Sequence, residues 1–209
     1  MFQDREHAAR RLAKRLERYR GQHPLILAIP RGAVPMARLI ASHLDGEMDV
    51  VLVRKLRAPL NEELAVGAID ENGGSYIADY AARMGANAEY LEREKLRQLE
   101  TLKRRREAYT PLRPAINPAG RVVIVVDDGL ATGFTMIAAL HAVRARKPAK
   151  LVCAVPVASE QALRKVTELA DEVICLHAPE RFYAVGQFYE EFDQVSDDEV
   201  VALLKGASA

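Results

Sequence analysis

The sequence has 209 residues, with 30 lysines and arginines against 29 aspartates and glutamates and a formal net charge of +1. This balance excludes a histone-like polycation, and a content of 49% hydrophobic residues excludes a disordered chain. We expect one domain over residues 1–209, and the lack of a long apolar run predicts a cytoplasmic protein without a membrane partner. Cys153 and Cys175 are too few for a disulfide framework, so we predict that they are buried free thiols.

The first part of the chain predicts alternating helices and strands followed by a hairpin. The periodicity indicates a helix at 4–19, a strand at 25–29, a helix at 34–44, a strand at 48–53 and two extended runs at 64–70 and 75–78. Asp4 is the expected N-cap of the first helix, whose outer face is basic. The polar segment after Val53 predicts an exposed loop that begins with Arg54 and Lys55, and the turn residues 71–74 predict the hairpin.

A long, highly charged helix is predicted at residues 87–110. Its apolar residues fall on one stripe, which we expect to face the rest of the protein: Met84, Ala88, Leu91, Leu99, Leu102 and Tyr109. Three prolines, Pro111, Pro114 and Pro118, end the helix and predict a stiff connection.

After this connection the pattern returns to regular alternation. It indicates a strand at 121–126, a helix at 134–145, a strand at 150–155, a helix at 159–170 and a strand at 172–176. Ser196 and Glu199 form a capping box that opens a last helix to about residue 205. The alternation predicts an α/β protein with an open, mostly parallel sheet and helices on both faces. We place the core at about 20–60 and 115–176 and an inserted hairpin and long helix at about 61–113.

Residues 121–135 carry the clearest chemical signal. Five consecutive β-formers end at Asp127 and Asp128, which places two carboxylates at the carboxyl edge of the predicted sheet, where open α/β folds bind ligands. Gly129 and Gly133 allow a tight turn before the next helix, whose free N–H groups attract an anion. A P-loop is excluded because no lysine stands where that motif requires one.

Two ligand interpretations follow from an acid pair beside an anion-binding loop. Carboxylates repel a polyphosphate but accept hydrogen bonds from a vicinal diol, so a ribose 5-phosphate fits with its hydroxyls on Asp127 and Asp128. Thr132 and Thr135 add hydroxyl donors for the phosphate. Alternatively, the two acids only cap a strand–helix junction, which occurs in many α/β proteins.

The segment 121–135 resembles the phosphoribosyl pyrophosphate binding motif of the type I phosphoribosyltransferases: a hydrophobic strand, two acids and a Gly/Thr-rich loop. Residues 29–35 resemble the pyrophosphate-binding loop of that family, which also follows a strand. Weaker matches at 53–56, 61–68 and 185–189 resemble a less characterised bacterial branch. The resemblance implies the type I phosphoribosyltransferase fold and a role in nucleotide salvage.

The resemblance also implies a reaction and its site. The family transfers the phosphoribosyl group of phosphoribosyl pyrophosphate to a nitrogen of a nucleobase-like acceptor, and Asp127, Asp128 and Arg31 are the implied catalytic residues. The 5-phosphate is assigned to Gly129, Leu130, Ala131, Thr132, Gly133, Phe134 and Thr135. Pyrophosphate is assigned to Arg31, Gly32 and Ala33, with Arg54 and Lys55 closing over it. Mg²⁺ is the implied cofactor, bound through substrate and water near Asp127 and Asp128.

The sequence says less about the acceptor than about the binding of phosphoribosyl pyrophosphate. The 6-oxopurine branch has an aspartate that assists proton transfer where this chain has Ala131, which puts hypoxanthine or guanine in doubt. By the same resemblance, residues 177–193 form a C-terminal hood in which Phe182 or Tyr183 stacks on the base and the backbone near Val185 binds it. These aromatic residues are equally consistent with core positions or with contacts in the homodimer that we expect.

A binding protein is the alternative from another functional class. The ends of the chain differ in charge, since residues 1–20 hold seven basic and three acidic residues whereas residues 180–200 hold one basic and seven acidic residues. A protein of this fold could sense phosphoribosyl pyrophosphate or a nucleotide while its basic first helix binds nucleic acid. The near-zero net charge argues against a nucleic-acid partner.

Overall fold

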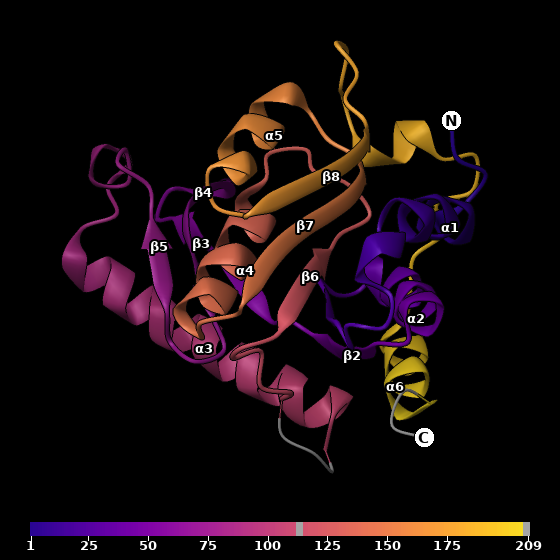
Figure 1. Cartoon of the computed structure of the whole chain (residues 1–209). Helices are drawn as coiled ribbons and strands as arrows, with labels where there is room; N and C mark the ends of the chain where they lie inside the picture. The colour runs from indigo at the N-terminus through magenta and orange to yellow at the C-terminus, as the bar shows by residue number, and fades with distance from the viewer. Residues whose placement is uncertain (112–114, 207–209) are drawn as a thin grey trace.

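A five-stranded parallel sheet forms the centre of the computed structural model, which describes residues 1–111 and 115–206 (Figure 1). The strand order is β2-β1-β6-β7-β8, and every neighbouring pair is parallel. The strands are β1 (Leu25–Ala28), β2 (Glu47–Val50), β6 (Val122–Val126), β7 (Lys150–Val157) and β8 (Glu172–His177). The predicted parallel α/β sheet is confirmed. The prediction for Pro114 and for the end of the insertion at 112–113 falls outside the described residues.

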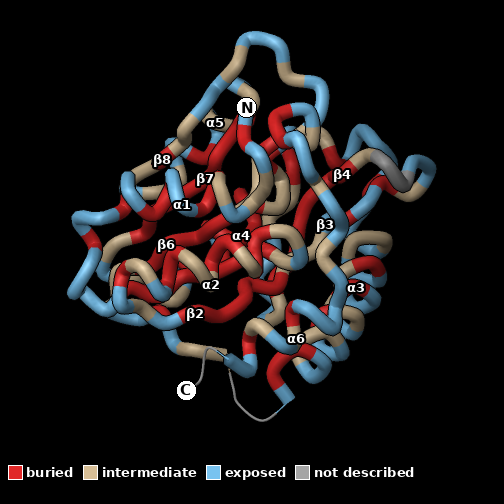
Figure 2. The backbone as a smooth tube through the Cα atoms, turned by 90° about the vertical axis from the view of Figure 1, so that its right-hand side faces the viewer, coloured by how far each residue is buried: buried red, intermediate tan, exposed pale blue. Residues whose placement is uncertain are grey.

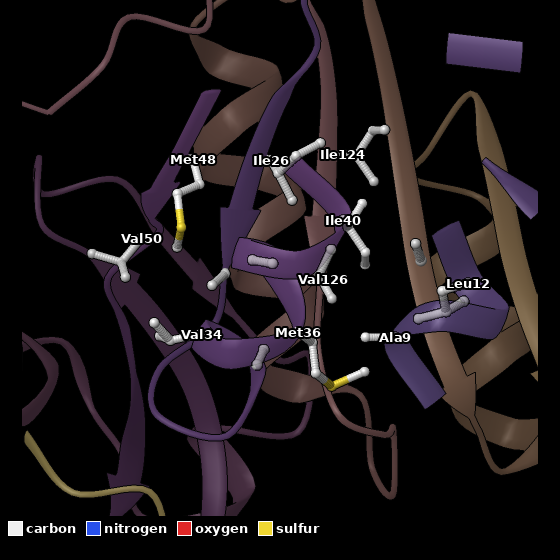
Figure 3. Packing of buried hydrophobic residues seen from close by; sticks show 14 of the residues in the cluster. Ala9, Leu12, Ile26, Val34, Met36, Ile40, Met48, Val50, Ile124 and Val126 are labelled. Carbon is white, nitrogen blue, oxygen red and sulfur yellow. The ribbon is translucent and has the colours of Figure 1, made fainter. Parts of the chain in front are cut away.

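Helices cover both faces of this sheet, as predicted. Alternate residues of β1 and β6 enter two separate clusters, because successive side chains of a strand point to opposite faces. Ile26 and Ile124 pack with α1 (Arg5–Arg15) and α2 (Ala33–Leu44), and Figure 3 shows these side chains pointing toward one another. Leu27 and Val125 pack on the other face with α4 (Phe134–Ala145) and α5 (Glu160–Thr167). Figure 2 shows the burial concentrated along the central strands.

A second, antiparallel sheet lies beside the first and changes one prediction. It consists of β3 (Val53–Ala58), β4 (Asn61–Asp70) and β5 (Ser75–Ile77) in that order. The hairpin of β4 and β5 is confirmed, but residues 53–58 form a strand and not the predicted loop. Leu56 and Ala58 are buried while Lys55 and Arg57 are exposed, so one face of this basic strand packs inward. The insertion therefore begins near residue 53 and not near residue 61.

The long helix α3 (Ala88–Tyr109) packs against this second sheet, close to the predicted bounds of 87–110, and Asn87 is its N-cap. Its buried face is less apolar than the predicted stripe. Glu94 and Gln98 are buried together with Leu102 and Tyr109. Met84, which we placed on the stripe, is 41% exposed in the short 3-10 helix η2 (Ala82–Met84) that precedes α3.

The first residues of the chain lie beside the segment that follows the 3-10 helix η3 (Val185–Phe188). The Asp4 side chain caps α1 by accepting the His7 N–H at 2.7 Å, and the 3-10 helix η1 (Glu17–Tyr19) follows. Strand-like pairing joins Phe2 to Tyr189, next to η3. The last helix, α6 (Asp197–Lys205), has the predicted capping box at Ser196.

Both cysteines lie in strands of the central sheet. Cys153 and Cys175 are both free; Cys153 is buried as predicted, whereas Cys175 is only half-buried at the edge strand β8. Over residues 1–111 and 115–206, no helix combines the length and the apolar character needed to cross a membrane.

Candidate functional site

The two acids lie at the carboxyl edge of the parallel sheet. Asp127 and Asp128 directly follow β6, which lies between β1 and β7. The chain leaves β1 toward α2 on one face and leaves β6 toward α4 on the other. Connections that diverge in this way open a crevice at the carboxyl ends of the strands, where sheets of this class bind ligands. The acid pair therefore occupies the position expected of a ligand site.

The loop after the acids forms a wall of a small pocket. This pocket of about 160 Å³ is lined by Lys55, Asp127, Gly129, Leu130, Ala131, Thr132, Gly133, Phe134, Thr135, Met136 and Val185. A Cβ on Gly129 would lie 2.6 Å from Cγ1 of Val185, so only glycine fits there. Gly133 precedes α4 with φ +79°, in the left-handed region that favours glycine. The first turn of α4 thus presents backbone N–H groups at the pocket.

The second predicted phosphate loop reaches the same acids. Gly32 packs so closely on Asp128 that a Cβ there would lie 2.0 Å from Oδ2 of that carboxylate. Helix α2 begins at Ala33, so a second helix N-terminus lies beside the acid pair. The peptide bond between Pro30 and Arg31 is cis. The Arg31 guanidinium, 41% exposed, lies 3.8 Å from Oδ2 of Asp197 at the start of α6. The structure therefore brings the Arg31 backbone to the site and turns its side chain toward α6.

Lys55 and Arg54 lie on opposite faces of β3. Lys55 lines the pocket with Asp127, whereas Nε of Arg54 donates to Oε1 of Gln98 on α3 at 2.6 Å. Adjacent side chains of a strand point in opposite directions, so these two cannot serve one site together. Burial lowers the pKa of Arg54. Of the two cations predicted to close over pyrophosphate, the structure brings Lys55 alone to the pocket.

The predicted hood, residues 177–193, contributes to the same region. Val185 lines the pocket. Phe182 packs on Phe188 with their ring centroids 5.2 Å apart and so joins the core. Tyr183 is 83% exposed, on the loop that projects from the molecule after β8 (Figure 1). Of the two aromatic residues predicted to stack on a base, Tyr183 is thus the accessible one.

The acid pair is held in an unusual electrostatic state. Burial, and then the adjacent charge of Asp128, raise the pKa of Asp127 well above its ordinary value. Burial also raises the pKa of Asp128, while Arg5 opposes that rise. Oδ1 of Asp127 accepts the Asp128 N–H at 2.9 Å. Among the described residues no donor contacts Oδ2 of Asp127 or Oδ1 of Asp128, and neither oxygen is sealed from solvent. Each acid thus keeps one oxygen available to a ligand hydroxyl.

Sequence reasoning assigned no role to the residue that contacts Asp128 most directly. Arg5, the first residue of α1, places Nε at 3.0 Å and Nη2 at 2.9 Å from Oδ2 of Asp128. The two residues are 123 positions apart, and Arg5 is one of seven basic residues in the first 20. No local pattern distinguishes it from its neighbours, so only the three-dimensional structure reveals the contact.

The donors at the site suit Mg²⁺ bound mainly by a substrate. The described residues contain no group of three or more histidine, cysteine, aspartate or glutamate side chains able to hold a metal ion by themselves. Mg²⁺ typically takes one or two carboxylates and completes its shell with water and substrate phosphates. Asp127 and Asp128, each with an open oxygen, fit that requirement.

A parallel sheet with two glycine-containing loops around an acid pair at its carboxyl edge defines a nucleotide- or sugar-phosphate-binding α/β protein. Comparison with known families identifies one family within this class. The chain matches the model of the phosphoribosyl transferase domain over residues 2–193, and it belongs to that family.

Individual relatives agree with this assignment. A protein of Mycobacterium tuberculosis, provisionally named as a phosphoribosyl transferase, is 42% identical over 208 residues. The match covers 99% of this chain and 47% of the relative, so the chain spans about half the length of the curated relatives it matches. The crystal structure of TT1426 from Thermus thermophilus is 45% identical, with a TM-score of 0.86 and 97% of each chain covered. A hypoxanthine-guanine phosphoribosyl transferase of L. donovani shares the fold alone, at 15% identity, a TM-score of 0.50 and coverage of 87% and 83%.

Proposed function

We propose that the protein transfers the 5-phosphoribosyl group of phosphoribosyl pyrophosphate to a nitrogen of a nucleobase or related acceptor, with release of pyrophosphate. One observation carries the proposal: two loops suited to phosphate meet at one acid pair, with Gly32 against Asp128 on one side and the 129–136 pocket wall on the other. A ligand with a phosphate, a diol and a pyrophosphate in that order matches this arrangement. Membership of the family supports the reaction class.

Each part of the site then has a chemical task. The open oxygens of Asp127 and Asp128 accept the ribose hydroxyls, and the negative charge there favours cationic character at C1. The amides at the start of α4 bind the 5-phosphate. As the C1–oxygen bond breaks, its electron pair leaves with pyrophosphate and the acceptor nitrogen forms the new bond to C1. Lys55 supplies positive charge beside the pocket, and Arg31 would exchange Asp197 for pyrophosphate.

Mg²⁺ belongs to this proposal as a cofactor held largely by the substrate. The ribose hydroxyls, the pyrophosphate oxygens and water would supply most of its ligands, with Asp127 and Asp128 nearby. When bound, the ion neutralises charge on the leaving pyrophosphate. The protein residues orient the ribose and exclude water from C1, which would otherwise compete with the acceptor.

The pocket also restricts the acceptor. Its titratable lining residues in the described chain are Lys55 and Asp127, and Ala131 stands where the 6-oxopurine branch has an acid. The proposal therefore favours an acceptor whose nitrogen attacks through its own lone pair without a dedicated protein base. We place the acceptor against Val185, with the exposed ring of Tyr183 closing over it.

The test is pyrophosphate release from phosphoribosyl pyrophosphate and Mg²⁺ with a panel of purine, pyrimidine and other nitrogen acceptors. We expect release with one acceptor class and, in the Asp127→Asn, Asp128→Asn double variant, a loss of at least about 100-fold in kcat/KM. The double variant should remain folded by circular dichroism because both amides keep the size of the acids.

Two results would contradict the proposal. Phosphoribosyl pyrophosphate that fails to bind wild-type protein in calorimetry would show that the site is misassigned. Tight binding without turnover for any acceptor would favour the regulatory alternative, a protein of this fold that senses phosphoribosyl pyrophosphate or a nucleotide. Salt-sensitive retention of RNA or DNA by the same protein would support that alternative further.

A further inference from the structure

The guanidinium of Arg5 is enclosed by three groups of the proposed site. Nε and Nη2 lie 3.0 and 2.9 Å from Oδ2 of Asp128, and Nη1 donates to the Asp193 carbonyl at 2.6 Å. The Phe192 ring covers its face, with 3.9 Å between Cζ and the ring centroid. Only 13% of the side chain is exposed. Both edges and one face of this cation are therefore occupied, which fixes its orientation.

The loop proposed for pyrophosphate rests on the same ion pair. A Cβ on Gly32 would lie 3.0 Å from Nε of Arg5 as well as 2.0 Å from Oδ2 of Asp128. The Gly32 backbone thus packs directly over the contact between cation and carboxylate. A change in the position of Arg5 would therefore displace both Asp128, on the ribose side of the site, and Gly32, on the pyrophosphate side.

The hood is joined to this cluster by further hydrogen bonds. The Phe2 N–H donates to the Phe188 carbonyl at 2.8 Å, and the Glu190 N–H donates to the Phe2 carbonyl at 2.9 Å. The Tyr189 hydroxyl donates to the backbone carbonyl of Asp128 at 2.6 Å. The N-terminus, the hood and Asp128 therefore form one connected unit, with Arg5 at its centre.

We infer that Arg5 is a positioning residue of the transferase site, which fixes the orientation of the Asp128 carboxylate with Oδ1 free for the ribose and couples that acid to the hood. The inference rests on the proposed function. Both donors of Arg5 go to Oδ2, so the ion pair orients the carboxylate without occupying the other oxygen. A guanidinium with its planar fork can do this, whereas an ammonium group cannot fix the carboxylate in the same way.

Among the described cations, Arg5 is the one whose side chain contacts the Asp128 carboxylate. Asp127, which follows β6, places a second carboxylate beside it, and the Tyr189 hydroxyl approaches the Asp128 backbone from the hood. Of the other cations near the site, Lys55 lines the pocket on the Asp127 side and Arg31 turns to Asp197.

Calorimetric titration of phosphoribosyl pyrophosphate with Mg²⁺ tests the inference in Arg5→Met and Arg5→Lys. We expect Arg5→Met to weaken binding by about tenfold or more. Arg5→Lys should lie between Arg5→Met and wild type. Arg10→Met is the matched control, because Arg10 lies on the same helix in an exposed pair with Glu6. It should bind as wild type does.

A second measurement separates this inference from the proposed function. Amide hydrogen exchange of the protein without ligand should be faster at residues 127–129 and 188–193 in Arg5→Met than in wild type, because Arg5 joins these segments. Wild-type protein that does not bind phosphoribosyl pyrophosphate would refute the proposed function, whereas this exchange would still decide whether Arg5 couples Asp128 to the hood.

Binding that is unchanged or tighter in Arg5→Met, or exchange at residues 127–129 and 188–193 that matches wild type, would overturn the inference. Tighter binding would mean that Arg5 blocks the site. If Arg5→Met does not fold, Phe192→Leu replaces it, since that variant removes the ring and leaves the ion pair. We expect Phe192→Leu to weaken binding in the same direction by a smaller factor, and unchanged binding would equally overturn the inference.

Discussion

The Asp127 side chain is a half-buried carboxyl with a second carboxyl beside it. Burial and the charge of Asp128 raise its pKa, so the folded protein holds this proton more tightly than the unfolded chain, where an aspartate titrates near about 3.9. The contribution of Asp127 to the free energy of unfolding therefore falls as the pH rises from that value toward the pKa of the folded state. At higher pH this contribution stays low. A charge that destabilises the folded state in this way is common at functional sites.

This leads to a stability prediction for Asp127→Asn. The amide removes the charge and keeps an oxygen that can accept the Asp128 N–H. We expect the variant to melt about 2–4 °C above wild type at pH 8, with the gain disappearing near pH 4, where the wild-type carboxyl is protonated. Thermal unfolding followed by circular dichroism across this pH range measures the effect.

Asp128→Asn serves as the comparison at the neighbouring position. That change leaves the largely buried Arg5 without its carboxylate, so it should not stabilise the protein at any pH. Equal melting temperatures for Asp127→Asn and wild type throughout the range would show that Asp127 is not a destabilising charge.

For single residues, sequence reasoning succeeds where the residues of a site stand next to one another in the chain. Asp127 and Asp128 stand in one run with the loop that follows them, so strand ending, carboxylates and glycines are all visible together. Arg5 belongs to the same cluster through contacts across 123 positions, and its only local feature is the charged face of a helix. Arg54 shows the converse, since its place in a basic run suggested a ligand residue while the alternation of β3 directs it to Gln98.

Among the strands, β3 is the one that sequence reasoning missed. Its arginines and lysine suggest a solvated loop, and the register with β4 shifts between Leu56 and Ala58, which disturbs the regular alternation. The polar face of the strand is nevertheless what brings Lys55 to the pocket. The long helix α3 was predicted with nearly correct bounds because its charge pattern and its apolar residues are local signals.

The attachment of α3 to the central sheet depends on Arg106. Its Nη1 lies 3.0 Å from Oδ1 of Asp49 on β2, and its Nε donates to Glu71 in the β4–β5 turn at 2.7 Å. The Arg106 side chain is 15% exposed, and Asp49 is buried. This network joins the insertion to the sheet. The charge of Arg106 and the charges of Asp49 and Glu71 compensate one another where they are shielded from water.

We therefore expect Arg106→Met to lower the free energy of unfolding by about 3–5 kcal/mol, because it leaves Asp49 and Glu71 without their shared cation. Urea denaturation measures this change. Arg104→Met is the control, since Arg104 pairs with Glu100 at the surface, and it should change stability by less than about 0.5 kcal/mol. A similar small effect for both variants would mean that the network does not hold the insertion.

At the scale of the whole molecule, the class of fold is predictable from alternation, but the meeting of distant segments is not. Strand–helix alternation predicts a parallel sheet with two helical layers, and both are present. The order β2-β1-β6-β7-β8 brings the 29–33 and 127–135 loops to one edge although about 95 residues separate them in sequence. The pairing of Phe2 with Tyr189 adds the N-terminus and the hood to that edge, and no sequence pattern predicts this pairing.

If these segments form one site, a ligand should stabilise them together. Phosphoribosyl pyrophosphate with Mg²⁺ should slow amide hydrogen exchange several-fold in residues 1–8, 29–34, 127–135 and 185–193, because opening of any one segment would break contacts to the others. Helix α3 should be unaffected on its outer face. The Asp127→Asn, Asp128→Asn double variant should show no such protection at the same ligand concentration. Protection confined to 127–135 would mean that the ligand contacts only the phosphate loop and that the N-terminus and hood are not part of the binding unit.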